Sequence, residues 1–221
     1  MKHTVLNCLA LLTITGSAVT AQSSPRPVAP ATVHLAVRPD SRLWIEGSSN
    51  LRDWSCEATA LEASVDVDAA LSENESPENI AQLRRVKVRV PVSALKCGRS
   101  QMDRIMYRAL KVDDEPDCRQ ILGSFDVVDT DSDGEFSLRT LGTLRVAGRE
   151  NAVRLDVDVE QLADGTLRAQ GALPILMTDY GINPPTALLG VIRTENRIVV
   201  KFDLRVDRHT MVAAAKIGDR D

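Results

Sequence analysis

Several residue types and patterns are scarce or missing in this chain of 221 residues, and each absence removes a class of function. Aromatic residues make up 3% of the chain, the formal net charge is −4, and no basic stripe with interleaved aromatics occurs. Nucleic acid is therefore not an expected partner. Beyond residue 21 no run approaches about 18 apolar residues, so we expect no stable membrane span.

Motifs for catalysis and for metal binding are also missing. Beyond residue 21 the only histidines are His34 and His209, and the chain has no paired histidine spacing, no CxxC and no GxSxG. We therefore predict no metal site, no cofactor and no catalytic residues. The catalytic alternative is a thiol nucleophile, Cys97 or Cys118, with His34 as its base.

Residues 129–135 begin like a calcium-binding loop, with acidic residues at the first, third and fifth positions. The twelfth position, which should carry a bidentate glutamate, is Thr140. Such a calcium-binding loop lies between two helices, whereas alternating apolar and polar residues, as in strands, flank this segment. We interpret it as an acidic hairpin tip.

The first 21 residues have the layout of a secretory signal peptide. Lys2 precedes an apolar run at residues 5–14, and small residues lead to Ala21, after which we expect cleavage. Residues 22–31 form a proline- and serine-rich linker, and residues 207–221 a flexible tail. Export to an oxidising compartment predicts one disulfide among Cys56, Cys97 and Cys118, and spacing does not select the pair.

Between linker and tail, apolar and polar residues alternate as they do in strands with one wet face. The segments are 33–37, 43–47, 63–67, 86–90, 125–127, 136–138, 144–146, 153–159, 167–173 and 198–206. Turn signals separate many of them: Asp133-Gly134, Ala147-Gly148, Asp164-Gly165 and Glu195-Asn196. This pattern predicts an all-β antiparallel sheet that curls or closes, although a sandwich fits the same alternation.

One helix is predicted over residues 100–110, with Ser100 as its N-cap and Asp103 in its first turn. Its apolar face carries methionines, which either offer an adaptable apolar surface or plug one end of the core. A weaker helix start lies at residues 76–78.

Residues 173–190, LPILMTDYGINPPTALLG, break the alternation. Gly181 allows a tight turn, and Pro184 and Pro185 favour an extended path without ladder hydrogen bonds. We expect this apolar segment to cover an opening of the sheet beside the predicted helix.

The order of five motifs resembles the YceI-like polyisoprenoid-binding family. The motifs are LRDWSCE at 51–57, VPVSALKCG at 90–98, MDRIMYRALK at 102–111, GTLRVAG at 142–148 and MTDYGI at 177–182. The resemblance covers residues 32–206. It implies an extended, eight-stranded, lipocalin-like antiparallel β-barrel with one amphipathic helix packed at its open region.

The same resemblance implies an exported, non-catalytic protein of the bacterial periplasm. Such a protein would hold an isoprenoid-type lipid and act as a carrier or scavenger related to envelope stress. It favours Cys56–Cys97 as the disulfide, with Cys118 as a buried thiol. The alternative function is a structural or interaction module with a packed barrel. The assembly is left open between a monomer and a homodimer.

The predicted ligand contacts are apolar residues on the inner strand faces, on the helix and in the 173–190 segment. They are Val86, Val88, Met102, Ile105, Met106, Phe125, Leu144, Val146, Leu155, Val157, Met177, Tyr180, Ile182, Val200 and Phe202. Such a site needs few ionisable groups, and its specificity would come from a few polar groups at the mouth.

Overall fold

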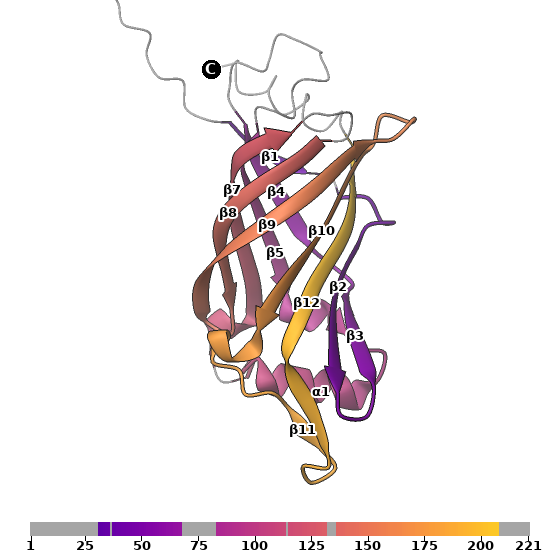
Figure 1. Cartoon of the computed structure of the whole chain (residues 1–221), viewed down its shortest axis with the longest axis vertical. Helices are drawn as coiled ribbons and strands as arrows, with labels where there is room; N and C mark the ends of the chain where they lie inside the picture. The colour runs from indigo at the N-terminus through magenta and orange to yellow at the C-terminus, as the bar shows by residue number, and fades with distance from the viewer. Residues whose placement is uncertain (1–30, 36, 68–82, 114, 132–135, 208–221) are drawn as a thin grey trace, which may run out of the picture.

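The computed structural model describes residues 31–35, 37–67, 83–113, 115–131 and 136–207 (Figure 1). The predicted signal peptide, the tail beyond residue 207, the helix start at 76–78 and the turn at Asp133-Gly134 lie outside these residues.

The described chain is mainly β-structure. Its strands are β1 (Ala31–Leu35), β2 (Arg42–Ser49), β3 (Asp53–Ala58), β4 (Glu62–Val67), β5 (Leu83–Pro91), β6 (Leu95–Lys96), β7 (Gln120–Asp131), β8 (Phe136–Val146), β9 (Arg149–Gln161), β10 (Leu167–Leu176), β11 (Thr186–Ala187) and β12 (Ile192–Val206). Its helices are α1 (Ser100–Ala109) and the short 3-10 turns η3 (Val92–Ala94), η4 (Pro116–Arg119) and η5 (Met177–Tyr180).

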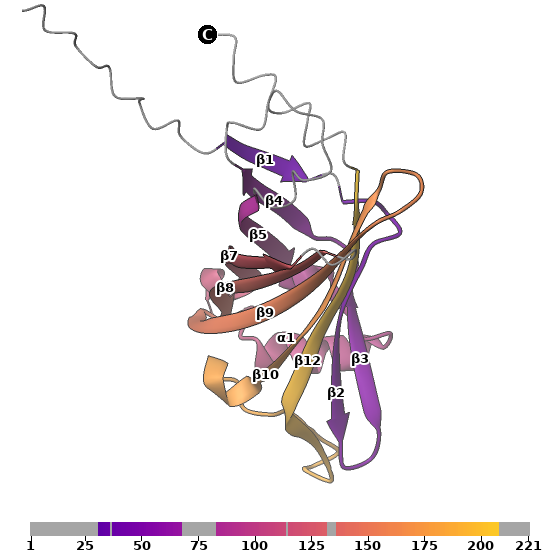
Figure 2. The same cartoon turned by 45° about the horizontal axis from the view of Figure 1, so that its top comes forward.

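The strands form one antiparallel sheet in the order β1-β4-β5-β7-β8-β9-β10-β12-β2-β3-β6, and β11 pairs with β12. The ten alternating segments predicted from the sequence fall in nine of these strands, because 136–138 and 144–146 both lie in β8, so the sheet has more strands than the eight that the resemblance implies. The sheet curls around its interior (Figure 2), but its ends, β1 and β6, are not hydrogen-bonded to each other among the described residues. The fold is therefore a half-barrel rather than a closed barrel.

Alternation along each strand separates an apolar inner face from a wet outer face. In β9, Leu155 and Val159 are buried, whereas Arg154, Asp156 and Asp158 are exposed. Ion pairs join neighbouring strands on the outside, such as Arg139 Nη1 to Asp129 Oδ2 at 2.8 Å and Lys87 Nζ to Asp66 Oδ2 at 3.0 Å. The predicted one-sided alternation is confirmed.

The turn predictions have two outcomes. Ala147-Gly148 joins β8 to β9 with φ of 49° and 73°, as a tight hairpin turn requires. The predicted turn at Glu195-Asn196 is wrong, because both residues lie inside β12, where the register with β2 shifts between Thr194 and Ile198. A bulge at this point bends the strand without reversing it.

Helix α1 crosses one end of the half-barrel, and β1 lies at the opposite end (Figure 1). The predicted helix range, residues 100–110, is confirmed to within one residue by α1. The predicted N-cap is wrong: Arg99 is the N-cap, without a side-chain capping bond, and Ser100 is the first helical residue. Asp103 instead accepts a hydrogen bond from the backbone N of Cys97 at 2.7 Å, which ties the first turn to the preceding chain.

Candidate ligand-binding cavity

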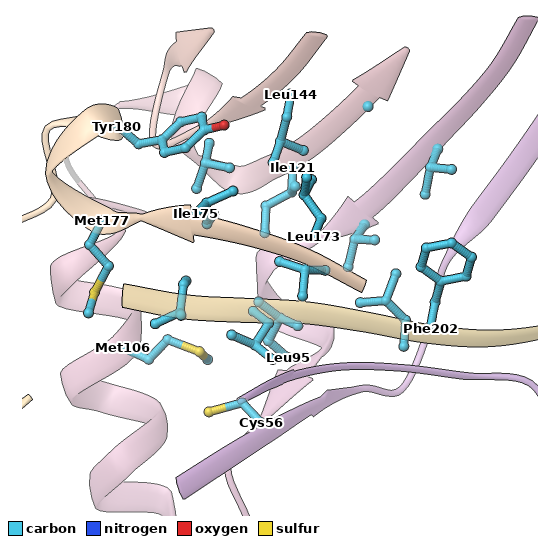
Figure 3. Close-up of a pocket in the computed structure, with 18 of the residues that line it drawn as sticks. Cys56, Leu95, Met106, Ile121, Leu144, Leu173, Ile175, Met177, Tyr180 and Phe202 are labelled. Atoms are coloured by element: carbon cyan, nitrogen blue, oxygen red, sulfur yellow. The ribbon is translucent and has the colours of Figure 1, made fainter. Parts of the chain in front are cut away.

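The inner face of the sheet encloses a hollow of about 410 Å³. Side chains of β2, β5, β7 to β10 and β12 line it, and α1, η5 and β11 line it at one end. Figure 3 shows Met106 of α1 and Met177 of η5 together at one end of this lining, with Phe202 of β12 at the other. The volume falls within the range of about 300–1,000 Å³ that is typical of pockets for small organic ligands.

All fifteen residues predicted to contact a ligand line this hollow. The strand residues among them come from β5, β7, β8, β9 and β12. The others lie in α1 and η5, except Ile182, which follows η5. The structure thus brings together side chains that are more than a hundred residues apart. Their role as ligand contacts stays a prediction.

The rings of two phenylalanines lie against glycines of the sheet, an arrangement that affects how much of the hollow they fill. Phe202 pairs with Gly171 across β12 and β10, and the ring of Phe125 lies against Gly123, two residues earlier in β7. A Cβ atom on Gly171 would lie 2.6 Å from Cζ of Phe202, so the ring rests on the wall where a side chain is missing. Glycine at this position therefore lets the phenylalanine ring lie along the sheet.

The η5 segment, residues 177–182, is packed tightly at one end of the hollow. Met177, Tyr180 and Ile182 are 6%, 2% and 5% exposed. Gly181 has φ of 66°, the left-handed conformation that ends the 3-10 turn, as the sequence predicted. Burial raises the pKa of the Tyr180 phenol, and the charge of Asp179 adds to the effect.

Helix α1 covers the same end differently, since none of its residues is buried. Met102, Ile105 and Met106 are half-buried and line the hollow. The helix is attached through Cys97, which forms a disulfide with Cys56 of β3, and Cys97 Sγ lies 3.8 Å from Sδ of Met106. The predicted disulfide is confirmed.

Polar groups gather at the α1 end of the hollow. Ser49, Arg52, Thr186 and Thr194 contribute to the lining there, around the turn between β2 and β3 and around β11. Deeper inside, the hydroxyl of buried Thr140 already donates to the carbonyl of Leu155 at 2.7 Å. The arrangement gives an apolar interior with a more polar mouth.

Sequence reasoning missed several lining residues. Leu51, Arg52 and Trp54 come from the β2–β3 hairpin, for which no strand at β3 was predicted, and Ala169 lies inside β10. The signal for β3 was present, since Trp54, Cys56 and Ala58 alternate with Asp53, Ser55 and Glu57.

The thiol hypothesis loses one of its two nucleophiles, because Cys97 is oxidised in the disulfide. Cys118 lies outside that disulfide and is buried in η4, with its Sγ 4.0 Å from Oε2 of Glu115. His34 is paired with Ser64 across β1 and β4, and the register continues through Lys87 to Ser124. Three strand spacings of about 4.8 Å thus separate the His34 backbone from β7, the strand that follows η4.

Two further properties concern the described residues alone. They contain no group of three or more His, Cys, Asp or Glu side chains placed to hold a metal ion. No helix among them combines the length and the apolar character needed to cross a bilayer.

Comparison with known proteins places this geometry in a family. The YceI-like domain matches residues 45–206 of the chain, whereas no curated protein sequence matches it. BcnA from Burkholderia cenocepacia has a similar fold, with a TM-score of 0.55 and 15% identity over 75% of this chain and 95% of its own. A polyisoprenoid binding domain from Saccharophagus degradans, implicated in plant cell wall breakdown, has a TM-score of 0.58 and 13% identity over 80% and 98%.

Proposed function

The chain belongs to the YceI-like domain family, and from that premise we propose that it binds an isoprenoid-type or similar amphiphilic lipid in the hollow of its half-barrel. The hollow of about 410 Å³ with its apolar lining is the observation that carries the proposal. Each buried methylene contributes about 0.8 kcal/mol, so an apolar chain of modest length binds without a dense set of polar contacts.

The position of the polar groups supports an amphiphile over a pure hydrocarbon. Arg52, Thr186 and Thr194 lie at the α1 end, where a polar head would remain while the chain fills the interior. The polyisoprenoid binding domain of Saccharophagus degradans has the same fold, which agrees with this class of ligand.

We further propose that the protein acts outside the cytoplasm, as a non-catalytic carrier or scavenger in the bacterial envelope or as a secreted protein, related to envelope stress. The signal-peptide layout of residues 1–21 supports export. The Cys56–Cys97 disulfide is consistent with an oxidising compartment.

The alternative, a packed barrel that acts only through its outer surface, requires an interior filled by its own side chains. A hollow of this volume argues against it, because well-packed interiors leave few voids larger than a water molecule.

Two alanines on β10 provide a matched test. Ala169 faces the hollow, whereas Ala172, three residues later, is exposed on the outer face. Ala169→Trp fills part of the hollow, and Ala172→Trp adds the same bulk outside. Native mass spectrometry of the protein purified from its own host, together with lipid extraction, should show a bound apolar molecule in the wild type and in Ala172→Trp, and little in Ala169→Trp.

Recovery of empty wild-type protein, or equal lipid content in both tryptophan variants, would contradict the proposal. Circular dichroism of each variant shows that the comparison is made between folded proteins.

A further inference from the structure

Two neighbouring hairpins at the α1 end expose large apolar side chains. Leu51 is 67% exposed in the β2–β3 turn, and Leu188, Leu189 and Val191 are 66%, 107% and 69% exposed in the turn between β11 and β12. We refer to these four residues as the apolar tip. Both hairpins extend beyond α1 at the end of the molecule that lies away from β1 (Figures 1 and 2).

Hydrogen bonds join the two hairpins into one surface. The side chain of Asn50 donates to the carbonyl of Val191 at 2.9 Å and accepts from the backbone N of Arg193 at 2.8 Å. The backbone N of Asn50 donates to the carbonyl of Arg193 at 3.1 Å. The four apolar side chains are thus presented together.

The backbone at Leu188 and Leu189 is unusual for leucine. Their φ angles are 51° and 57°, and Gly190 N donates to the carbonyl of Ala187 at 3.1 Å, which closes a tight turn. Asn and Gly are the usual residues in such a turn because a side chain with positive φ is strained. Leucine at these two positions lowers stability and exposes apolar surface. Contact with a partner outside the protein therefore explains the two side chains better than a role in folding does.

The apolar tip adjoins the mouth of the hollow. Leu51 itself lines the hollow, as do Ala187 and Ile192, the residues that flank the second turn. Met102 and Ile105 of α1 complete the lining at this end. Whatever contacts the tip therefore lies next to the opening.

The charge around the mouth is positive although the whole chain has a formal net charge of −4. Residues 50–53, 99–109 and 186–195 carry five arginines, all exposed, against three carboxylates. The arginines are Arg52, Arg99, Arg104, Arg108 and Arg193, and the carboxylates are Asp53, Asp103 and Glu195.

Within the described part of the chain, none of these five arginines is in an ion pair with a carboxylate. Some strand arginines, by contrast, are in ion pairs, as Arg42 is with Glu57 and Arg168 with Asp203. Two of the three carboxylates are already engaged, because Asp103 accepts from the backbone N of Cys97 and Glu195 from Ser48 Oγ. The arginines around the mouth are available to an anionic partner.

We propose that this end of the molecule docks on an anionic lipid bilayer, with the apolar tip at the boundary between headgroups and acyl chains and the arginines against the lipid phosphates. Apolar side chains beside unpaired basic residues are the combination that binds membrane interfaces. Docking brings the mouth of the hollow to the bilayer surface. The purpose of docking, exchange of a lipid, rests on the proposed function, whereas docking itself is measured without any cargo.

The test is Leu188→Asn/Leu189→Gly, the Asn-Gly variant, which preserves the geometry of the turn and removes two leucines from the apolar tip. The control is Val128→Ser/Leu141→Ser, since Val128 and Leu141 are 51% and 43% exposed on strands β7 and β8. Each protein is floated with vesicles of phosphatidylcholine alone and with vesicles containing a quarter of phosphatidylglycerol.

We expect the wild type and the control to float with the anionic vesicles. The Asn-Gly variant should bind these vesicles at least about tenfold more weakly than the wild type. Added salt should weaken the binding of the wild type. Equal flotation of the Asn-Gly variant and the wild type, or flotation with neither vesicle, would overturn the proposal. So would a concentration-dependent dimer in sedimentation velocity that the Asn-Gly variant loses, because the tip would then be an interface between two copies.

Discussion

The two structures that cover the α1 end of the half-barrel, the η5 segment and helix α1, differ in how they are packed. Met177, Tyr180 and Ile182 of the η5 segment are each less than a tenth exposed, whereas α1 has no buried residue. Both present apolar side chains to the same hollow. The first is part of the wall, and the second lies over the opening.

The two covers are also attached differently. The side chain of Asn196 in β12 accepts from the backbone N of Thr178 and donates to its hydroxyl, and Asn151 of β9 donates to the carbonyl of Asp179. The η5 segment is thus bonded to strands on both sides. Helix α1 is attached through the chain before it, by the Cys97 disulfide and by Tyr107, whose hydroxyl donates to the carbonyl of Leu95 at 2.9 Å. We expect α1 to open at a lower free energy than the η5 segment, because it buries less apolar surface.

The largest difference should appear when the aromatic residue of the wall is removed. Tyr180→Ala leaves a cavity at a position that is 2% exposed, and it should lower the free energy of unfolding by about 3–5 kcal/mol. Urea denaturation measures this loss. Tyr180→Phe keeps the ring and should retain most of the stability, so an equal loss in both variants would show that the hydroxyl, not the packing, holds the segment.

Removal of the disulfide should affect α1 more than the η5 segment. Cys56 and Cys97 are 41 residues apart in sequence, and a cross-link over such a loop is typically worth about 2–4 kcal/mol. Cys56→Ala/Cys97→Ala should lower stability by about that amount and speed amide exchange in α1. Unchanged amide exchange in α1, with faster exchange in residues 177–182, would show that the disulfide holds the η5 segment in place rather than α1.

One methionine in each cover allows the same substitution to be compared. Met177→Ala should cost about 2–5 kcal/mol, as for a buried side chain, whereas Met106→Ala should cost less by about 2 kcal/mol because Met106 is only half-buried. Thermal and urea denaturation of the two variants give the difference. Equal costs would mean that α1 is packed as firmly as the η5 segment.

The smallest effect is a dependence on alkaline pH. Burial raises the pKa of Tyr180 above its unfolded value near 10, so its contribution to stability is fully present below that pH and is lost as pH rises through the folded pKa. The chain has two tyrosines, Tyr107 in α1 and Tyr180 in the η5 segment. Titration of tyrosinate absorbance should show a late step that is missing in Tyr180→Phe; the same curve in both proteins would contradict the burial effect.

The sequence predicts much of the sheet and of the inner face, because both depend on a regular local pattern. Alternation identified segments of β9, β10 and β12, and the 3.6-residue period identified α1. Inner residues such as Leu155 and Val157 follow directly from that alternation once one face is assigned to the interior. A single residue of slip would have moved all of them to the outer face.

The parts that the sequence did not predict depend on contacts between distant segments. Asn196 looked like a turn residue, but its side chain bonds Thr178 and it lies within the irregular part of β12. Among the residues that the structure describes, β1 and β6 end the hydrogen-bonded order without pairing to each other, and no local sequence pattern specifies this open arrangement. The choice between a hollow and a packed interior likewise depends on how the whole sheet curls.

Hydrogen–deuterium exchange with and without a polyprenyl alcohol compares the two covers in one experiment. Amides of α1 should exchange faster than those of residues 177–182 in the empty protein, and they should slow when the ligand fills the hollow, while those of residues 177–182 change little. Equal protection of both covers in the empty protein, together with no response of α1 to the ligand, would contradict the distinction between a fixed wall and a cover over the opening.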